Sequence, residues 1–221
     1  MKKLALILAL LLVASGAEAA VVFQNLGTSA PPTTLGPYHV GAFDQTPQAA
    51  ITDFTSVSSI PGNPEGSDLG VSPNLDKRTI GASWGTWSNG YTGVVYYGAD
   101  VTSMMLTLPT GTAAFYFYAE PNQFSDFNVS ATTAQGATSG PISVNGQGGA
   151  NGFAFYSSPG DPILTITVTC TDASGFAIGE FGAVSVQQAG SEPVPAVSPW
   201  GLGILGAALA LGGAFLLKKR A

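Results

Sequence analysis

Two glutamates, Glu120 and Glu180, are the residues whose type best suits catalysis. A pair of carboxyl groups hydrolyses a glycoside when one protonates the leaving oxygen and the other attacks or activates water. Glu120 ends the run FYFYAE, whereas Glu180 is in phase with Phe176 and Ile178 on a strand face that should be apolar. A buried carboxylate there is unfavourable unless it is paired, protonated or metal-bound, and a β-bulge would turn it away. We therefore favour a structural role for Glu180, place calcium binding second and rank a glycosidase last.

Calcium is the one cofactor that the sequence leaves open. Loops of an all-β domain can supply the hard oxygen ligands that calcium prefers, and the candidate ligands are Asp172 and Glu180. A loop that contains Glu65, Asp68 and Asp76 is an alternative set. No EF-hand spacing is present, so this prediction depends on residue type alone.

Aromatic residues gather in the middle of the chain and suggest another kind of site. An exposed aromatic row beside acidic side chains could stack on sugar rings while polar groups fix the sugar hydroxyls. Tyr116 and Tyr118 are the candidates, because they alternate with Phe115 and Phe117 and so face the other way along a strand. Packing in the core is the alternative interpretation for most of the aromatic side chains.

The segment Gly81–Gly85 fits G-x-S-x-G, the nucleophile-elbow motif of α/β-hydrolases, with Ser83 as the nucleophile. That elbow needs a strand before it and a helix after it, but the Gly-, Asn- and Ser-rich residues 86–93 suit a loop or a strand. The single histidine, His39, precedes Ser83, whereas that fold places its histidine last. We interpret the short match as chance and predict that the protein is not an enzyme.

The charge distribution argues against nucleic acid as a partner. Between residues 20 and 190, two basic residues (Lys77 and Arg78) minus eleven acidic ones give a net charge of −9. Nucleic-acid binding requires clustered Lys and Arg side chains. An acidic surface instead helps to keep an exported protein in solution.

Residues 20–190 have the pattern of one all-β domain. Apolar and polar residues alternate through 164–170, which places the single cysteine, Cys170, on the apolar face of a strand. We expect an antiparallel β-sandwich of jelly-roll type, with short strands and long loops in the Gly-, Pro-, Ser- and Thr-rich part before residue 89. Similar β-rich runs, separated by turn residues, occur at 92–97, 104–108, 115–118, 128–131, 152–156 and 176–186.

Residues 1–19 have the layout of a secretory signal peptide. Lys2 and Lys3 precede an unbroken apolar run, and Ala17 and Ala19 form a small-x-small cleavage site. We expect cleavage after Ala19.

The C-terminal segment predicts a membrane anchor. Residues 191–199 form a Pro-rich spacer. Residues 200–217 carry no charge, and a helix of this length would reach about 27 Å, close to the hydrocarbon thickness of about 30 Å. The basic tail, residues 218–221, should stay on the cytoplasmic side and leave the domain outside the inner membrane.

This C-terminal segment resembles bacterial C-terminal sorting signals of the IPTL-CTERM class, whose pattern begins Ile-Pro-Thr-Leu-Ser-Glu-Trp-Gly. Ala196 and Pro199 depart from that pattern, and Ser191-Glu192-Pro193 supplies only half of the Pro-Glu-Pro motif of the related PEP-CTERM class. The resemblance implies a surface or exported protein of a Gram-negative bacterium, anchored in the inner membrane until a sorting protease cuts the tail. The positions that match or change conservatively are Val194, Pro195, Val197, Ser198, Trp200 and Gly201.

The sequence therefore favours a non-enzymatic exported protein of the cell surface or extracellular matrix. Signal peptidase and a sorting protease would process it, and the C-terminal helix would hold it transiently in the inner membrane. A calcium-assisted carbohydrate-binding module, with extracellular polysaccharide as its partner, is the alternative. A secreted glycosidase is the less favoured one.

Overall fold

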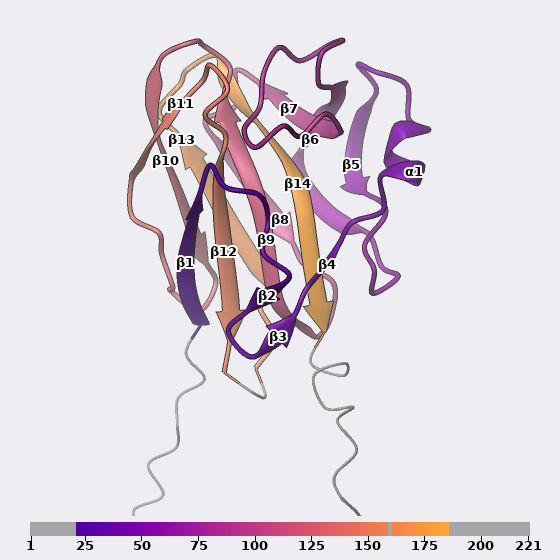
Figure 1. Ribbon diagram of the computed structural model, residues 1–221, viewed down its shortest axis with the longest axis vertical. Helices are drawn as coiled ribbons and strands as arrows, with labels where there is room; N and C mark the ends of the chain where they lie inside the picture. Colours follow the sequence, from indigo (N-terminus) through magenta and orange to yellow (C-terminus); the bar gives the residue numbers. More distant parts are fainter. Residues whose placement is uncertain (1–20, 159–160, 186–221) are drawn as a thin grey trace, which may run out of the picture. The chain divides into compact units, whose positions relative to one another are not determined.

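The computed structural model describes residues 21–158 and 161–185, and their regular structure is almost entirely β-strand (Figure 1). One short helix, α1 (Gln45–Ala49), begins at Asp44, whose side chain accepts a hydrogen bond from the Thr46 amide. The strands are β1 (Val21–Gly27), β2 (Thr34–Leu35), β3 (Tyr38–His39), β4 (Gly41–Ala42), β5 (Ser56–Ile60), β6 (Leu69–Thr79), β7 (Val94–Ala99), β8 (Ser103–Thr107), β9 (Thr112–Pro121), β10 (Asp126–Thr133), β11 (Ile142–Asn145), β12 (Asn151–Ser157), β13 (Thr165–Cys170) and β14 (Gly175–Ser185).

The predictions for the two ends of the chain lie outside these described residues. They are the signal peptide with its cleavage site at Ala17 and Ala19, the spacer with its sorting motif, the membrane span and the basic tail. Among the residues that the structure describes, no helix is long and apolar enough to cross a membrane.

One antiparallel sheet of twelve strands contains most of the described residues. Its strand order is β1-β12-β9-β14-β7-β6-β8-β13-β10-β11, with β4 added to β14 and β5 to β6. Strand β6 pairs with β8 through Gly70–Ser72 and with β7 through Asp76–Thr79. The prediction of an all-β antiparallel fold is therefore confirmed. A jelly roll would have two separate sheets, whereas here β6 joins one half (β1-β12-β9-β14-β7) to the other half (β8-β13-β10-β11) in a single sheet.

The two halves of the curled sheet share one hydrophobic core. Its side chains come from both halves, and Cys170, 5% exposed, lies among them as predicted. Burial of this apolar surface is the main favourable contribution to folding. Representative members are Phe115, Phe153 and Phe176 from β9, β12 and β14, and Leu106, Val129 and Val168 from β8, β10 and β13.

A second, smaller cluster covers the outer face of β9, β12 and β14. Tyr116 and Tyr118 belong to it, opposite Phe115 and Phe117, so the predicted alternation along β9 is confirmed. Leu35 and Tyr38, from the β2–β3 hairpin, and Trp87, from the β6–β7 connection, pack on this face. The outer face is therefore covered by chain segments that the sequence predicts only as loops.

A β-bulge in β14 exchanges the two faces of that strand. Glu180 has a φ of +53°, and the pairing of β14 with β9 shifts register between Gly179 and Gly182. Phe176 and Ile178 face the main core before the bulge, and Phe181 faces it afterwards. The interpretation that a bulge turns Glu180 away from the core is confirmed.

The part before residue 89 contains more strand than its composition indicates. Strand β6 is eleven residues long and is among the longest described, although it contains Pro73 and several polar residues. Because β6 joins both halves of the sheet, each part of it faces different neighbours, and no single period of two runs through its sequence.

Candidate functional site

Six residues of the β6–β7 connection, Trp84 to Asn89, cross the outer face of the sheet above two buried carboxylates. We call this segment the strap. Figure 1 shows the β6–β7 connection at the same end of the sheet as the turn between β9 and β10. Each half of the strap is bound by one glutamate, Glu120 on β9 or Glu180 on β14.

Glu120 accepts hydrogen bonds from two loops. Trp84 Nε1 donates to Oε2 at 2.8 Å, and Thr86 Oγ1 donates to Oε1 at 3.2 Å. The Gly148 amide, in the β11–β12 turn, also donates to Oε1 at 2.8 Å. Burial raises the pKa of Glu120 to about 7, although these hydrogen bonds act in the opposite direction. The carboxylate, fully buried, thus joins the strap to the β11–β12 turn.

Glu180 binds the other half of the strap. Trp87 Nε1 and Asn89 Nδ2 each donate to its Oε2 at 3.1 Å. Burial raises the pKa of Glu180, and the two hydrogen bonds oppose that shift. The bulge makes this contact available, because without it the side chain would point into the main core.

The two glutamates considered for glycoside hydrolysis therefore lie on the same outer face of adjacent strands, where Glu120 is the cross-strand partner of Ala177. Both carboxylates accept hydrogen bonds from the strap that covers them. Three of the five donors are N–H groups of the strap's own side chains. In this geometry the carboxylates hold a loop in place.

Tyr116 and Tyr118 were expected on an exposed face, and this expectation is wrong. The two side chains are 2% and 0% exposed. The face has the predicted direction, but it is covered, and the Tyr118 hydroxyl donates to the Ser29 carbonyl of the segment that crosses it. Neither ring offers an open surface to a sugar.

Asp172 and Glu180, the candidate calcium ligands, take part in separate groups of hydrogen bonds. Asp172 is fully buried and accepts from the backbone amides of Gln123 and Ser174, at 2.8 and 2.9 Å. Over residues 21–158 and 161–185, no three His, Cys, Asp or Glu side chains gather in a group that could hold a metal ion. The two carboxylates thus accept N–H donors in different places and do not form one set of oxygen ligands.

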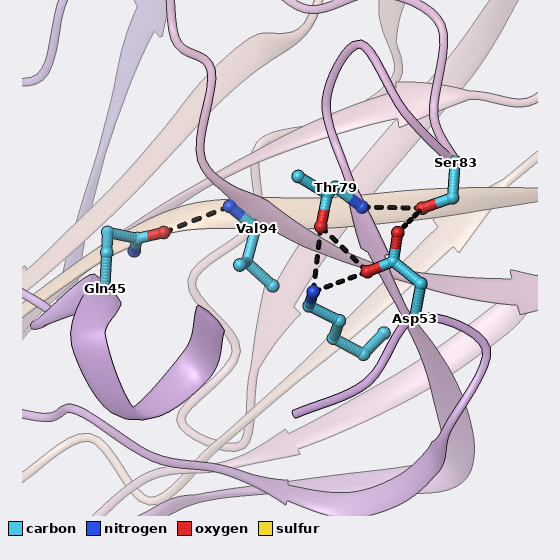
Figure 2. A network of polar contacts seen from close by, with 6 residues as sticks. Gln45, Asp53, Thr79, Ser83 and Val94 are labelled. Carbon is cyan, nitrogen blue, oxygen red and sulfur yellow. Dashed lines mark hydrogen bonds and ion pairs between the residues drawn. The ribbon is translucent and has the colours of Figure 1, made fainter. Parts of the chain in front are cut away.

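A polar network that sequence reasoning missed fixes the start of the strap (Figure 2). Asp53 accepts hydrogen bonds from Lys77 Nζ, from Thr79 Oγ1 at 2.8 Å and from Ser83 Oγ. Ser83 Oγ also accepts from the Thr79 amide at 2.8 Å. Burial opposes ionisation of Asp53, but the hydrogen bonds and the charge of Lys77 outweigh it and lower its pKa to about 2.

This network accounts for Ser83 of the G-x-S-x-G segment. Its hydroxyl donates to a carboxylate whose low pKa makes it a weak base, and it accepts from the backbone. His39 pairs with Thr34 in the β2–β3 hairpin. The sequence did offer one signal for the network. Lys77 is in phase with the buried Leu75, and a buried lysine requires a partner.

A hollow of about 120 Å³ lies beside the strap, at its first residues. It is formed where the strap meets the β9–β10 turn and the β11–β12 turn. Its lining residues are Ser83, Trp84, Gly85, Thr86, Asn122, Phe124 and Gly146.

No protein-family model matches the chain, and no curated protein matches its sequence. Among solved structures, a peptidoglycan O-acetylesterase has 17% identity and a TM-score of 0.33, covering 61% of this chain and 34% of that one. The enzymatically active domain of tailspike protein 4 from bacteriophage CBA120 has 18% identity and a TM-score of 0.20, covering 60% and 21%. This chain therefore spans about a third and a fifth of those chains. At such low TM-scores neither similarity bears on the fold or the activity of this chain.

Proposed function

We propose that this chain is a non-enzymatic protein, exported and displayed at the cell surface or in the extracellular matrix by its C-terminal sorting signal. The observation that carries the proposal is that the acidic side chains stabilise the fold by accepting hydrogen bonds. Glu120, Glu180 and Asp53, which a hydrolase could use as acid or base, each accept hydrogen bonds that hold the β6–β7 connection to the sheet. The signal-peptide pattern at the N-terminus and the sorting-signal pattern at the C-terminus support export and display at the surface.

The proposal also assigns roles to the ends. Signal peptidase would cleave after Ala19, the helix of residues 200–217 would hold the chain in the inner membrane, and a sorting protease would recognise residues 194–201. The exported domain would then reach the surface with a net charge of −9 over residues 20–190 and without bound nucleic acid.

An epitope tag inserted after Gly136 tests this proposal. Gly136 lies in an exposed turn, and a Cβ atom added there would meet nothing within 4 Å. We expect antibody to label intact cells, or to detect the tagged protein in the culture medium. Detection of the tag only after the inner membrane has been broken would contradict export and display.

A further inference from the structure

We propose that a row of four aromatic side chains, exposed at its two ends and half-buried between them, binds a neutral polysaccharide. The row consists of Phe54, Tyr97, Trp84 and Phe124, with Arg78 between the first two. The guanidinium carbon of Arg78 lies 4.1 Å from the centroid of the Phe54 ring and 5.3 Å from that of Tyr97. The Tyr97 and Trp84 rings follow with their centroids 5.1 Å apart, and Trp84 and Phe124 line the same hollow.

The exposure of its two end residues singles this row out. Phe54 is 62% and Phe124 is 68% exposed, more than any other large hydrophobic side chain in the described part of the chain. Scattered apolar side chains at a surface are ordinary, but a continuous aromatic surface marks a binding site. Here Phe54 and Phe124 are strongly exposed at the two ends of one row of contacts, and the half-buried rings of Tyr97 and Trp84 lie between them.

Backbone geometry supports the outward position of Phe54. This residue has a φ of +68°, in the left-handed region that bulky side chains rarely adopt. Its amide donates to the Lys77 carbonyl at 2.8 Å, which holds the strained residue beside β6. Strained residues of this kind persist where the surrounding structure fixes them, and they cluster at binding sites.

The hollow supplies polar recognition next to the aromatic rings. The Asn122 side chain is exposed and makes no hydrogen bond to any part of the chain that the structure describes, so its amide is free to donate to and accept from sugar hydroxyls. Gly85 lies beside the Phe124 ring in this hollow, since a Cβ atom added there would be in ordinary contact with the ring at 3.7 Å. Pockets that combine apolar rings with a few polar groups are typical of small-ligand sites.

The charges around the row favour a neutral ligand. Arg78 pairs with Asp76 at 3.3 Å, and Lys77 pairs with Asp53. Both basic side chains of the described residues are therefore neutralised, and the surrounding domain is strongly acidic. An anionic polysaccharide would be repelled, whereas the flat faces of neutral sugar rings can stack on successive aromatic rings. The row extends over several rings and thus fits a chain of sugars.

The row is ordered before any ligand arrives. Trp84 is held by its hydrogen bond to Glu120, and the Tyr97 hydroxyl donates to the Ser174 carbonyl at 2.6 Å. A surface fixed in this way loses little conformational freedom on binding. Glu120 and the strap therefore serve the site as positioning groups.

Binding of neutral hexasaccharides to the full-length chain tests the proposal. The chain would be purified in a detergent without a sugar headgroup, and the probes would be hexamers of β-1,4-glucose, β-1,4-N-acetylglucosamine and α-1,4-glucose, with a galacturonate hexamer as the acidic comparison. We expect at least one neutral hexamer to bind with a Kd of about 1 mM or tighter, measured by calorimetry and by tryptophan fluorescence. Phe54→Ala and Phe124→Ala should each raise that Kd by about fivefold or more, and Phe124→Tyr should retain binding.

The control is Leu164→Ala, which removes a 53% exposed apolar side chain outside the row and should leave the Kd unchanged. Because all three side chains are exposed, the variants should keep the melting temperature of the parent. The proposal is overturned if no neutral hexamer binds, if only the acidic one binds, or if both phenylalanine variants bind as well as the parent. The assay uses purified protein, so its result does not depend on export and display.

Discussion

At the scale of single residues, Glu120 gives the stability of the domain a distinct pH dependence. Its pKa is about 7 in the folded chain and 4.5 in its reference state, so the folded state holds the proton more tightly. The contribution of Glu120 to the free energy of unfolding is fully present below pH 4.5 and is lost as the pH rises through about 7. The loss amounts to about 3 kcal/mol. Urea denaturation at a series of pH values should show a steeper decline in the parent than in Glu120→Gln, which keeps the smaller contribution of Glu180, whose pKa is also raised by burial. Asp161→Asn, at an exposed position, should behave like the parent, and equal slopes for parent and Glu120→Gln would contradict the assignment.

Asp53 is the second residue with a measurable role. Asp53→Asn removes the negative partner of Lys77, which is 4% exposed and would keep an uncompensated charge. We expect a loss of about 3 kcal/mol in the free energy of unfolding at pH 7. Since the pKa of Asp53 is lowered to about 2 from 3.8, its contribution is present above pH 3.8 and disappears as the pH falls through 2. Replacing Lys77 by Met in the same chain should recover much of the loss. No recovery would show that the ion pair is not the cause.

At the scale of elements, the close fit of β9 against β14 depends on glycine. A Cβ atom at Gly182 would lie 2.2 Å from Cε1 of Tyr116, inside the covered outer face. Gly182→Ala should therefore lower the free energy of unfolding by about 2 kcal/mol or more. Gly85→Ala is the matched control, because its Cβ would have ordinary contact with Phe124 at 3.7 Å. Equal denaturation midpoints for the two variants would contradict the described packing.

The strands of the second half of the chain could be predicted because a period of two runs through them, interrupted in β14 at the bulge. In β9 that period correctly places Phe115 and Tyr116 on opposite faces, and in β14 it marks Glu180 as a carboxylate on an apolar face, for which a bulge is one of the explanations. The covering of the outer face could not be predicted, because the strap and the β2–β3 hairpin have no period of their own. For the same reason Phe54 and Phe124 were missed as site residues. Phe54 and Phe124 lie in loops 70 residues apart, and the fold alone brings them to the two ends of one row of contacts.

At the scale of the whole molecule, the sorting motif should decide whether the domain stays in the membrane. Substitution of Pro195 and Trp200 by Ala removes two of the four identities with the IPTL-CTERM pattern and keeps the apolar segment. We expect this variant to accumulate in the inner membrane with its tail attached, as seen by fractionation and immunoblotting. Ser191→Ala, outside the motif, should be processed like the parent. Normal release of the doubly substituted chain would show that the motif is not read.

The intact mass of the protein, taken from native cells and from the culture medium, tests the central claim most directly. If the chain is exported and displayed through a sorting signal, the mass will correspond to a chain that begins after Ala19 and ends before Trp200. A mass that includes Ala221 in both fractions would contradict the claim, because the C-terminal segment would then be a permanent anchor.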